Sequence, residues 1–236
     1  MTVKRLLGLT LALGTVAVAA APATGLPVTR AVLTPDGTPY VLRHPVRGTY
    51  VVRSTPHSGD WNEREVFWPP SATSEANSTS CAEWQRGQGI DQQGAALRIT
   101  DTNGVVRAIT VGRSIYEYNF WLFFFLSWNT AMPGYFSWFG GVDLSGYLGK
   151  GPAVYPLNLC ARTSGNVVQF IIWRPGEAPP PWGSTTQGGS ATIPATAPAS
   201  GFTGWYVGHI VRGTSTTFSR TSVDGSIPRD RNLAGR

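Results

Sequence analysis

The sequence predicts an all-β protein, a two-sheet antiparallel β-sandwich of the jelly-roll type that carries one disulfide. Short runs rich in β-branched and aromatic residues alternate with turns that contain Gly, Pro and Asn. No long stretch keeps apolar residues at helical spacing without an interrupting Gly or Pro. Only 14% of the residues are charged and 42% are hydrophobic, a composition that disfavours both coiled coils and disordered chains.

Residues 1–23 have the features of a secretory signal peptide. Lys4 and Arg5 precede an apolar run, Leu6 to Ala21, and small residues follow up to Ala23. The run is shorter than the ~20 residues that a membrane span needs, although an uncleaved N-terminal anchor is the alternative. We therefore expect a secreted or cell-envelope-associated protein, bacterial in the style of its signal, with no stable membrane span after processing.

The rest of the chain is long enough for one large domain. Residues 24–48 contain several prolines and predict an extended lead-in or an edge strand, because proline cannot donate to a central ladder. Residues 49–225 are expected to form the single sandwich domain, and the polar residues 226–236 a flexible tail. The expected strands are Thr49–Arg53, Glu63–Trp68, Ala95–Thr100, Val105–Val111, Tyr116–Trp128, Val154–Ala161, Val167–Trp173, Gly204–Val211 and Thr216–Val223.

Three local patterns predict particular elements of the fold. Asn103-Gly104 separates two β-rich runs, which is a strong hairpin signal. The run from Phe120 to Leu126 is apolar at both strand faces, which favours a strand buried on both sides. Residues 177–200, rich in Pro, Gly, Ser and Thr, predict a long loop.

The two cysteines, Cys81 and Cys160, predict a disulfide. An even pair in an exported chain is typical of an oxidised cystine, and a metal site would need more Cys or His residues. On the chain-entropy model, closing a loop of about 80 residues stabilises the fold by ~4 kcal/mol.

The charge pattern does not indicate a nucleic-acid partner. The formal net charge is +6, but the arginines stand singly, and no basic run or helix concentrates them.

Three segments resemble the concanavalin A-like jelly-roll group of lectins, laminin-G-type modules and glucanases. They are Gly94–Ile99, Asn166–Trp173 and Gly204–Ile210, the last followed by Gly213–Phe218 and Val223-Asp224-Gly225. The resemblance spans roughly residues 50–225 as a strand pattern. It implies a protein that binds glycans, or cleaves them, on its concave sheet.

The sequence departs from the catalytic branch of that group, because the laminarinase-like Glu-x-Asp-x-x-Glu signature is absent. The nearest candidates are Glu63 and Glu65, which strand periodicity places on one side, and Glu117. A retaining glycosidase needs carboxyl groups ~5 Å apart, and strand neighbours two residues apart lie ~6.5–7 Å apart. Two surface charges on an edge strand are the favoured alternative, and whether the protein is an enzyme stays open.

No cofactor is expected. Asp143 stands alone in its loop, and Asp91, Asp101 and Asp224 could complete a calcium site only if folding gathered them.

Aromatic residues beside loops give the strongest functional signal. The faces of aromatic rings stack on the C–H faces of sugars, because the ring quadrupole attracts weakly positive hydrogens. Core packing is the alternative for each residue. The expected ligand-binding residues are Trp61, Trp128, Tyr135, Trp138 and Trp182.

The favoured hypothesis is a secreted, non-catalytic β-sandwich that binds glycan or another cell-envelope polymer through these aromatic residues. A secreted glycoside hydrolase or polysaccharide lyase on the same fold is the second hypothesis. A structural envelope protein is the third.

Overall fold

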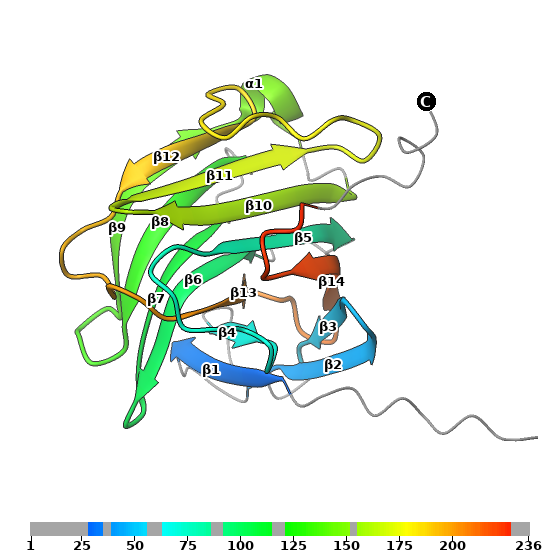
Figure 1. The fold of residues 1–236 in the computed structure, drawn as a ribbon. Coiled ribbons are helices and arrows are strands. Elements are labelled where there is room, and N and C mark those ends of the chain that lie inside the picture. Colours follow the sequence, from blue (N-terminus) through cyan, green and yellow to red (C-terminus); the bar gives the residue numbers. More distant parts are fainter. Residues whose placement is uncertain are drawn as a thin grey trace, which may run out of the picture.

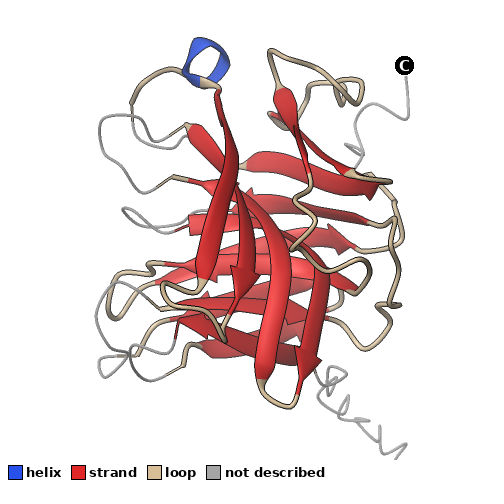
Figure 2. Cartoon of the chain, turned by 90° about the vertical axis from the view of Figure 1, so that its left-hand side faces the viewer, coloured by secondary structure: helices blue, strands red, loops and turns tan. Residues whose placement is uncertain are grey.

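The structure is a computed structural model that describes residues 28–34, 39–55, 63–85, 92–114, 121–151 and 155–227. Within this described part, two antiparallel seven-stranded sheets stack as a sandwich, so the expected all-β jelly roll is confirmed (Figure 1). Figure 2 shows strands joined by loops, with a short helix, α1 (Ser145–Leu148). No helix of the described residues is long and apolar enough to cross a membrane.

Each sheet contains strands from distant parts of the chain. Sheet A has, in spatial order, β1 (Thr29–Thr34), β4 (Arg64–Trp68), β13 (Phe202–Gly208), β6 (Gln92–Thr102), β7 (Val105–Arg113), β8 (Leu122–Asn129) and β9 (Phe136–Asp143). Sheet B has β12 (Gly188–Thr192), β11 (Val167–Trp173), β10 (Leu157–Ser164), β5 (Thr79–Gln85), β14 (Ser215–Ser222), β3 (Thr49–Arg53) and β2 (Val41–Val46).

The main core lies between the sheets and is rich in aromatic rings. Alternate residues of β8, Phe123 and Phe125, point into it, and both pack on Phe170 of β11 with ring centroids 4.9 and 5.6 Å away. Burial of such large side chains is the dominant favourable contribution to folding. The expected apolar strand is thus confirmed over Leu122–Asn129, where Leu122 and Phe124 are half-buried, while residues 116–120 of the expected strand lie outside the described residues.

Sheet A curls so strongly that its outer, concave face has a core of its own. β1 approaches β7 across that face, and Leu33, Val66, Trp128 and Tyr206 belong to a second cluster of buried side chains. The Tyr206 ring lies against the backbone of β6 and β7, where a Cβ on Gly112 would stand 3.2 Å from it. We call this second cluster the concave-face core.

The turns follow the local sequence signals. Asn103 and Gly104 both have positive φ, 53° and 79°, as a two-residue hairpin turn between β6 and β7 requires. The expected pair of strands forms as the β10–β11 hairpin, with Ser164 opposite Val167, but β10 ends three residues later than expected, at Ser164 instead of Ala161.

The described parts of the proline-containing lead-in, residues 28–34 and 39–48, belong to the sandwich, which corrects the expected start of the domain at residue 49. Its strands β1 and β2 are the outermost strands of sheets A and B, where Pro45 needs no ladder partner. The loop expected over residues 177–200 contains β12, paired with β11. The expected signal peptide and residues 228–236 of the expected tail lie outside the described residues.

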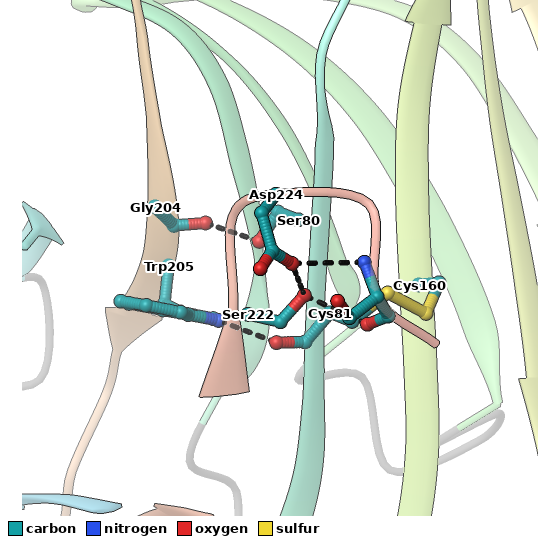
Figure 3. Close-up of a disulfide and its surroundings, with 8 residues drawn as sticks. Ser80, Cys81, Cys160, Gly204, Trp205, Ser222 and Asp224 are labelled. Atoms are coloured by element: carbon teal, nitrogen blue, oxygen red, sulfur yellow. Dashed lines mark hydrogen bonds between the residues drawn. A yellow bond between two sulfur atoms is a disulfide. The ribbon is translucent and has the colours of Figure 1, made fainter. Parts of the chain in front are cut away.

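The expected disulfide forms between Cys81 of β5 and Cys160 of β10, which stand opposite each other on neighbouring strands. It lies on the outer face of sheet B, packed with Ile171 and Trp173. Beside it, two hydrogen bonds join the sheets: the Ser80 hydroxyl donates to the Gly204 carbonyl over 2.5 Å, and the Trp205 indole donates to the Cys81 carbonyl over 3.0 Å (Figure 3).

Arg98 joins three loops at one bend of β6. It has a φ of 50° at a register irregularity and is buried. Its guanidinium donates to the carbonyls of Ala76, Gly165 and Pro198, with N···O distances of 2.9, 2.6 and 3.2 Å. The Arg98 side chain therefore holds three separate loops together.

Candidate functional site

Two large aromatic side chains are exposed on β9, the edge strand of sheet A. Trp138 has 63% of its surface exposed and Phe136 has 38%. They are two residues apart and therefore share one face of the strand. Phe124 of β8 meets Trp138 edge-on, with ring centroids 6.3 Å apart. We call Phe136 and Trp138 the β9 aromatic strip.

A short hairpin holds the strip in place. The Asn129 amide donates to the Tyr135 carbonyl over 2.8 Å, and the Tyr135 amide donates to the Met132 carbonyl over 3.1 Å. Gly134 and Tyr135 both have positive φ, 76° and 63°. The Tyr135 side chain is half-buried and packs against the concave-face core.

Arg64 of β4 reaches the same region across the curled sheet. Its guanidinium carbon lies 5.8 Å from the ring centroids of both Phe136 and Trp128, a cation–π geometry. Burial raises the pKa of the nearby Tyr206 phenol to about 12, although Arg64 opposes this, so Tyr206 is neutral and donates to the Gln92 side chain over 2.6 Å. The strip therefore rests on a fixed polar and aromatic base.

Trp128 was expected to contact ligand, and the structure corrects this expectation. It is 0% exposed, and its indole donates to the Thr110 hydroxyl over 2.8 Å. Its ring packs against Phe136, with centroids 4.9 Å apart. A buried ring cannot stack on a ligand, so Trp128 supports the strip instead of belonging to it.

Trp182 lies on the opposite face of the sandwich. It is half-buried beside the disulfide cluster on the outer face of sheet B, and the Arg162 guanidinium lies 4.4 Å from its ring centroid. The structure thus brings Tyr135 and Trp138 together but not Trp182. Trp61 and Glu117 lie outside the described residues.

Glu63 and Glu65 do lie together, but both are buried, at 1% and 2% exposure. The expectation of surface charges is therefore wrong. The amide of Tyr40 donates to the Glu65 carboxyl over 2.8 Å, and the Tyr40 hydroxyl donates to the Glu63 carbonyl over 2.8 Å. Burial, and then the neighbouring Glu65 carboxyl, raise the pKa of Glu63 to about 8. A carboxyl pair closed off in this way has no access to a polymer.

The aspartates considered for calcium occupy separate turns. Asp143 accepts from the Ser145 amide over 2.8 Å, Asp101 from the Gly104 amide over 3.2 Å, and Asp224 from the Ser226 amide over 2.9 Å. Among the residues that the structure describes, no group of three His, Cys, Asp or Glu side chains is arranged to hold a metal ion. Asp91 lies outside the described residues.

A cavity of about 1040 Å³ opens at the edge of the sandwich where β2 and β3 face the β4–β5 connection. Its walls come from residues 44–48 and 221–225 and from Pro69, Pro70, Ser71, Thr73, Glu75 and Asn77–Thr79, and Tyr50 and Trp205 lie at its base. We call it the edge cleft. No motif in the sequence indicates this cleft, because its residues come from segments far apart in the chain.

The sequence matches no family model and no curated protein. The fold is similar to that of solved β-sandwich structures. One is the carbohydrate binding module CBM66 from Bacillus subtilis, with a TM-score of 0.50 and 12% identity over 86% of this chain and 98% of that one.

Two further structures are comparably similar. A protein of unknown function with a galectin-like fold, from Bacillus subtilis, has a TM-score of 0.49 and 9% identity over 86% of this chain and 90% of that one. The exoplasmic/lumenal domain of VIP36 with Ca²⁺ and Man3GlcNAc has a TM-score of 0.49 and 8% identity over 89% and 88%. At 12% identity the likeness to CBM66 shows the fold alone.

Proposed function

We propose that this protein is a secreted, non-catalytic β-sandwich that binds glycan or another cell-envelope polymer through the β9 aromatic strip. The observation that carries the proposal is the exposure of Trp138, 63%, next to Phe136 on an edge strand. Burying a large apolar side chain is favourable, so a ligand that covers an exposed aromatic surface lowers the free energy of the complex.

The chemistry of the strip suits a saccharide chain. Ring faces attract the C–H hydrogens of sugars, and two rings on one strand can contact successive sugar residues of an extended chain. The hairpin fixes the backbone of the strip, Arg64 contacts the Phe136 ring and Phe124 contacts the Trp138 ring, which reduces the conformational entropy lost on binding.

Two other observations support the proposal. The fold is similar to that of a carbohydrate binding module, and the resemblance of Gly204–Ile210 and the segments after it to concanavalin A-like domains points to the same class. The leader sequence and the disulfide are typical of an exported protein. The buried Glu63–Glu65 pair gives no support to glycoside hydrolysis.

The test is retention of the purified protein on insoluble polysaccharides and on cell-wall preparations. We expect Trp138→Ala to reduce retention about tenfold, the equivalent of ~1.4 kcal/mol, and the double variant with Phe136→Ala to abolish it. Trp182→Ala, on the opposite face, is the matched control and should bind like the wild type. Unchanged binding by the double variant, with its thermal unfolding intact, would refute the strip as the binding surface.

A further inference from the structure

We propose that the edge cleft is a second binding site, a pocket that takes one or two neutral sugar residues, such as the end of a glycan chain or a free oligosaccharide. The cleft and the β9 aromatic strip have no residue in common, and the inference does not depend on the strip. It extends the proposed function from contact along a chain to recognition of a short saccharide.

The size of the cleft suits a small ligand. Small-molecule sites usually enclose about 300–1,000 Å³, and the edge cleft, with about 1040 Å³, is at the upper end of that range. Its walls come from both sheets and from the turn after β14, so a ligand would be held on several sides.

The base of the cleft is rigid. Tyr50 is stacked on one side by His44, with ring centroids 4.5 Å apart, and packs against Trp205, with centroids 5.0 Å apart. Trp205 is in turn fixed by its hydrogen bond to the carbonyl of Cys81, a residue of the disulfide (Figure 3). A base fixed in this way keeps its shape without ligand, which lowers the entropic cost of binding.

Asn77 supplies an oriented donor at the rim. Its side-chain oxygen accepts a hydrogen bond from the Gly165 amide over 2.8 Å, which assigns the other end of the side chain as the NH₂ group. No described residue accepts from that NH₂ group. It can therefore donate to a sugar hydroxyl with little loss of freedom.

Two carboxylates supply oriented acceptors. Glu75 accepts from the Thr73 hydroxyl over 2.7 Å, and its backbone pairs with Gly201. Asp224 accepts from Ser222 and Ser226, and these hydrogen bonds lower its pKa, so it remains ionised at neutral pH (Figure 3). Carboxylates beside an amide donor match the alternating donor and acceptor capacity of sugar hydroxyls.

The charge of the lining selects against acidic ligands. Glu75 and Asp224 carry carboxylates. Among the described residues that line the cleft, Arg47 is the one with a cationic side chain. The rings of Pro45, Pro69 and Pro70 supply apolar surface for the C–H face of a sugar. A neutral sugar can bond to the polar groups and pack on the apolar rings, whereas the two carboxylates would repel a uronate or a phosphate.

The test is a titration of the isotope-labelled protein, followed by amide NMR shifts. The probes are neutral mono- and disaccharides (glucose, galactose, mannose, N-acetylglucosamine, cellobiose and maltose), with glucuronate as the acidic counterpart. At least one neutral sugar should shift the amides of residues 44–48, 73–79 and 221–225. Glu75→Gln, nearly isosteric and at an exposed position, should raise the dissociation constant about tenfold or more.

One control variant separates this site from the strip. Trp138→Ala should leave the binding of the small sugar unchanged while it reduces retention on polymer. The inference fails if no neutral sugar shifts the cleft amides at tens of millimolar, if the shifts map to β9, or if glucuronate binds more tightly. The two sites are tested separately: polymer retention tests the β9 aromatic strip, and the amide titration tests the edge cleft.

Discussion

Tyr40 determines the environment of two acidic side chains. Glu63, just before β4, and Glu65, on β4, are both buried and interact with each other. Tyr40 covers them, because its amide donates to the Glu65 carboxyl and its hydroxyl donates to the Glu63 carbonyl. The carboxyl pair is therefore a structural feature of the interior, and its properties are those of a buried acid.

The pair predicts a specific dependence of stability on pH. Because the folded-state pKa of Glu63 is about 8, above its ordinary value of 4.5, its contribution to stability is complete below pH 4.5 and is lost progressively as pH rises towards 8. His209 acts in the opposite sense, since burial lowers its pKa to about 3 and its contribution is lost as pH falls below ~6.5. Between pH 6.5 and 8 the change in stability therefore comes from Glu63 and not from His209.

In that window we expect the free energy of unfolding to fall by up to about 2 kcal/mol. Urea unfolding at several pH values measures it. Glu63→Gln should flatten the curve, and Glu75→Gln, an exposed carboxylate, should leave the wild-type slope. A wild-type stability that stays constant or rises from pH 6.5 to 8 would contradict the assignment.

Arg98 carries a second prediction about single residues. Arg98→Ala removes three hydrogen bonds to carbonyls in separate loops, and bonds to charged groups contribute ~1.5–3 kcal/mol each. We expect a loss of about 3 kcal/mol or more in the free energy of unfolding. Arg107→Ala, which removes a single exposed bond to the Thr196 carbonyl, is the control and should cost less than about 1 kcal/mol. Equal effects of the two variants would refute the role given to Arg98.

At the scale of elements, the sequence was most informative where local chemistry determines structure. The Asn103-Gly104 turn and the β10–β11 hairpin form as expected, because positive φ at the turn residues is a local property. β12 was missed because Gly188 and Gly189 lack the side chains that mark a strand. They are small for a tertiary reason: a Cβ on Gly189 would stand 2.4 Å from a methyl carbon of Val142 on β9.

The aromatic candidates show the same limit. Trp128 and Trp138 both belong to the β8–β9 hairpin and look equivalent in the sequence. The curl of sheet A buries the first in the concave-face core and leaves the second on an edge strand. Only the three-dimensional path of the sheet distinguishes them. The edge cleft could not be predicted from the sequence for the same reason, because segments of both sheets form it.

The disulfide gives a prediction at this scale. Cys81 and Cys160 are 79 residues apart, so their link restricts a long loop of the unfolded chain. Replacing both by Ser should lower the free energy of unfolding by about 4 kcal/mol, measured by urea unfolding under non-reducing conditions. The variant should still fold, since hydrogen bonds from Ser80 and Trp205 also join the sheets. An unchanged midpoint and slope would show that the link does not stabilise the fold.

At the scale of the whole molecule, the filled concave face explains where contact is proposed. The resemblance to concanavalin A-like domains implied binding on the concave sheet. Here Val66, Trp128 and Tyr206 fill that face, and β1 closes over it. Exposed aromatic surface is left at the edge of the sheet, on β9, and a separate cleft opens between the sheets. We therefore propose that binding has moved from the centre of the sheet to its margins.

The most direct measurement is a crystal structure of the protein soaked with an oligosaccharide fragment of the polymer that retains it best. Our proposal predicts sugar rings stacked on Trp138 and Phe136, with the concave-face core unchanged. Sugar bound only elsewhere, with the β9 aromatic strip bare and clear of crystal contacts, would contradict it.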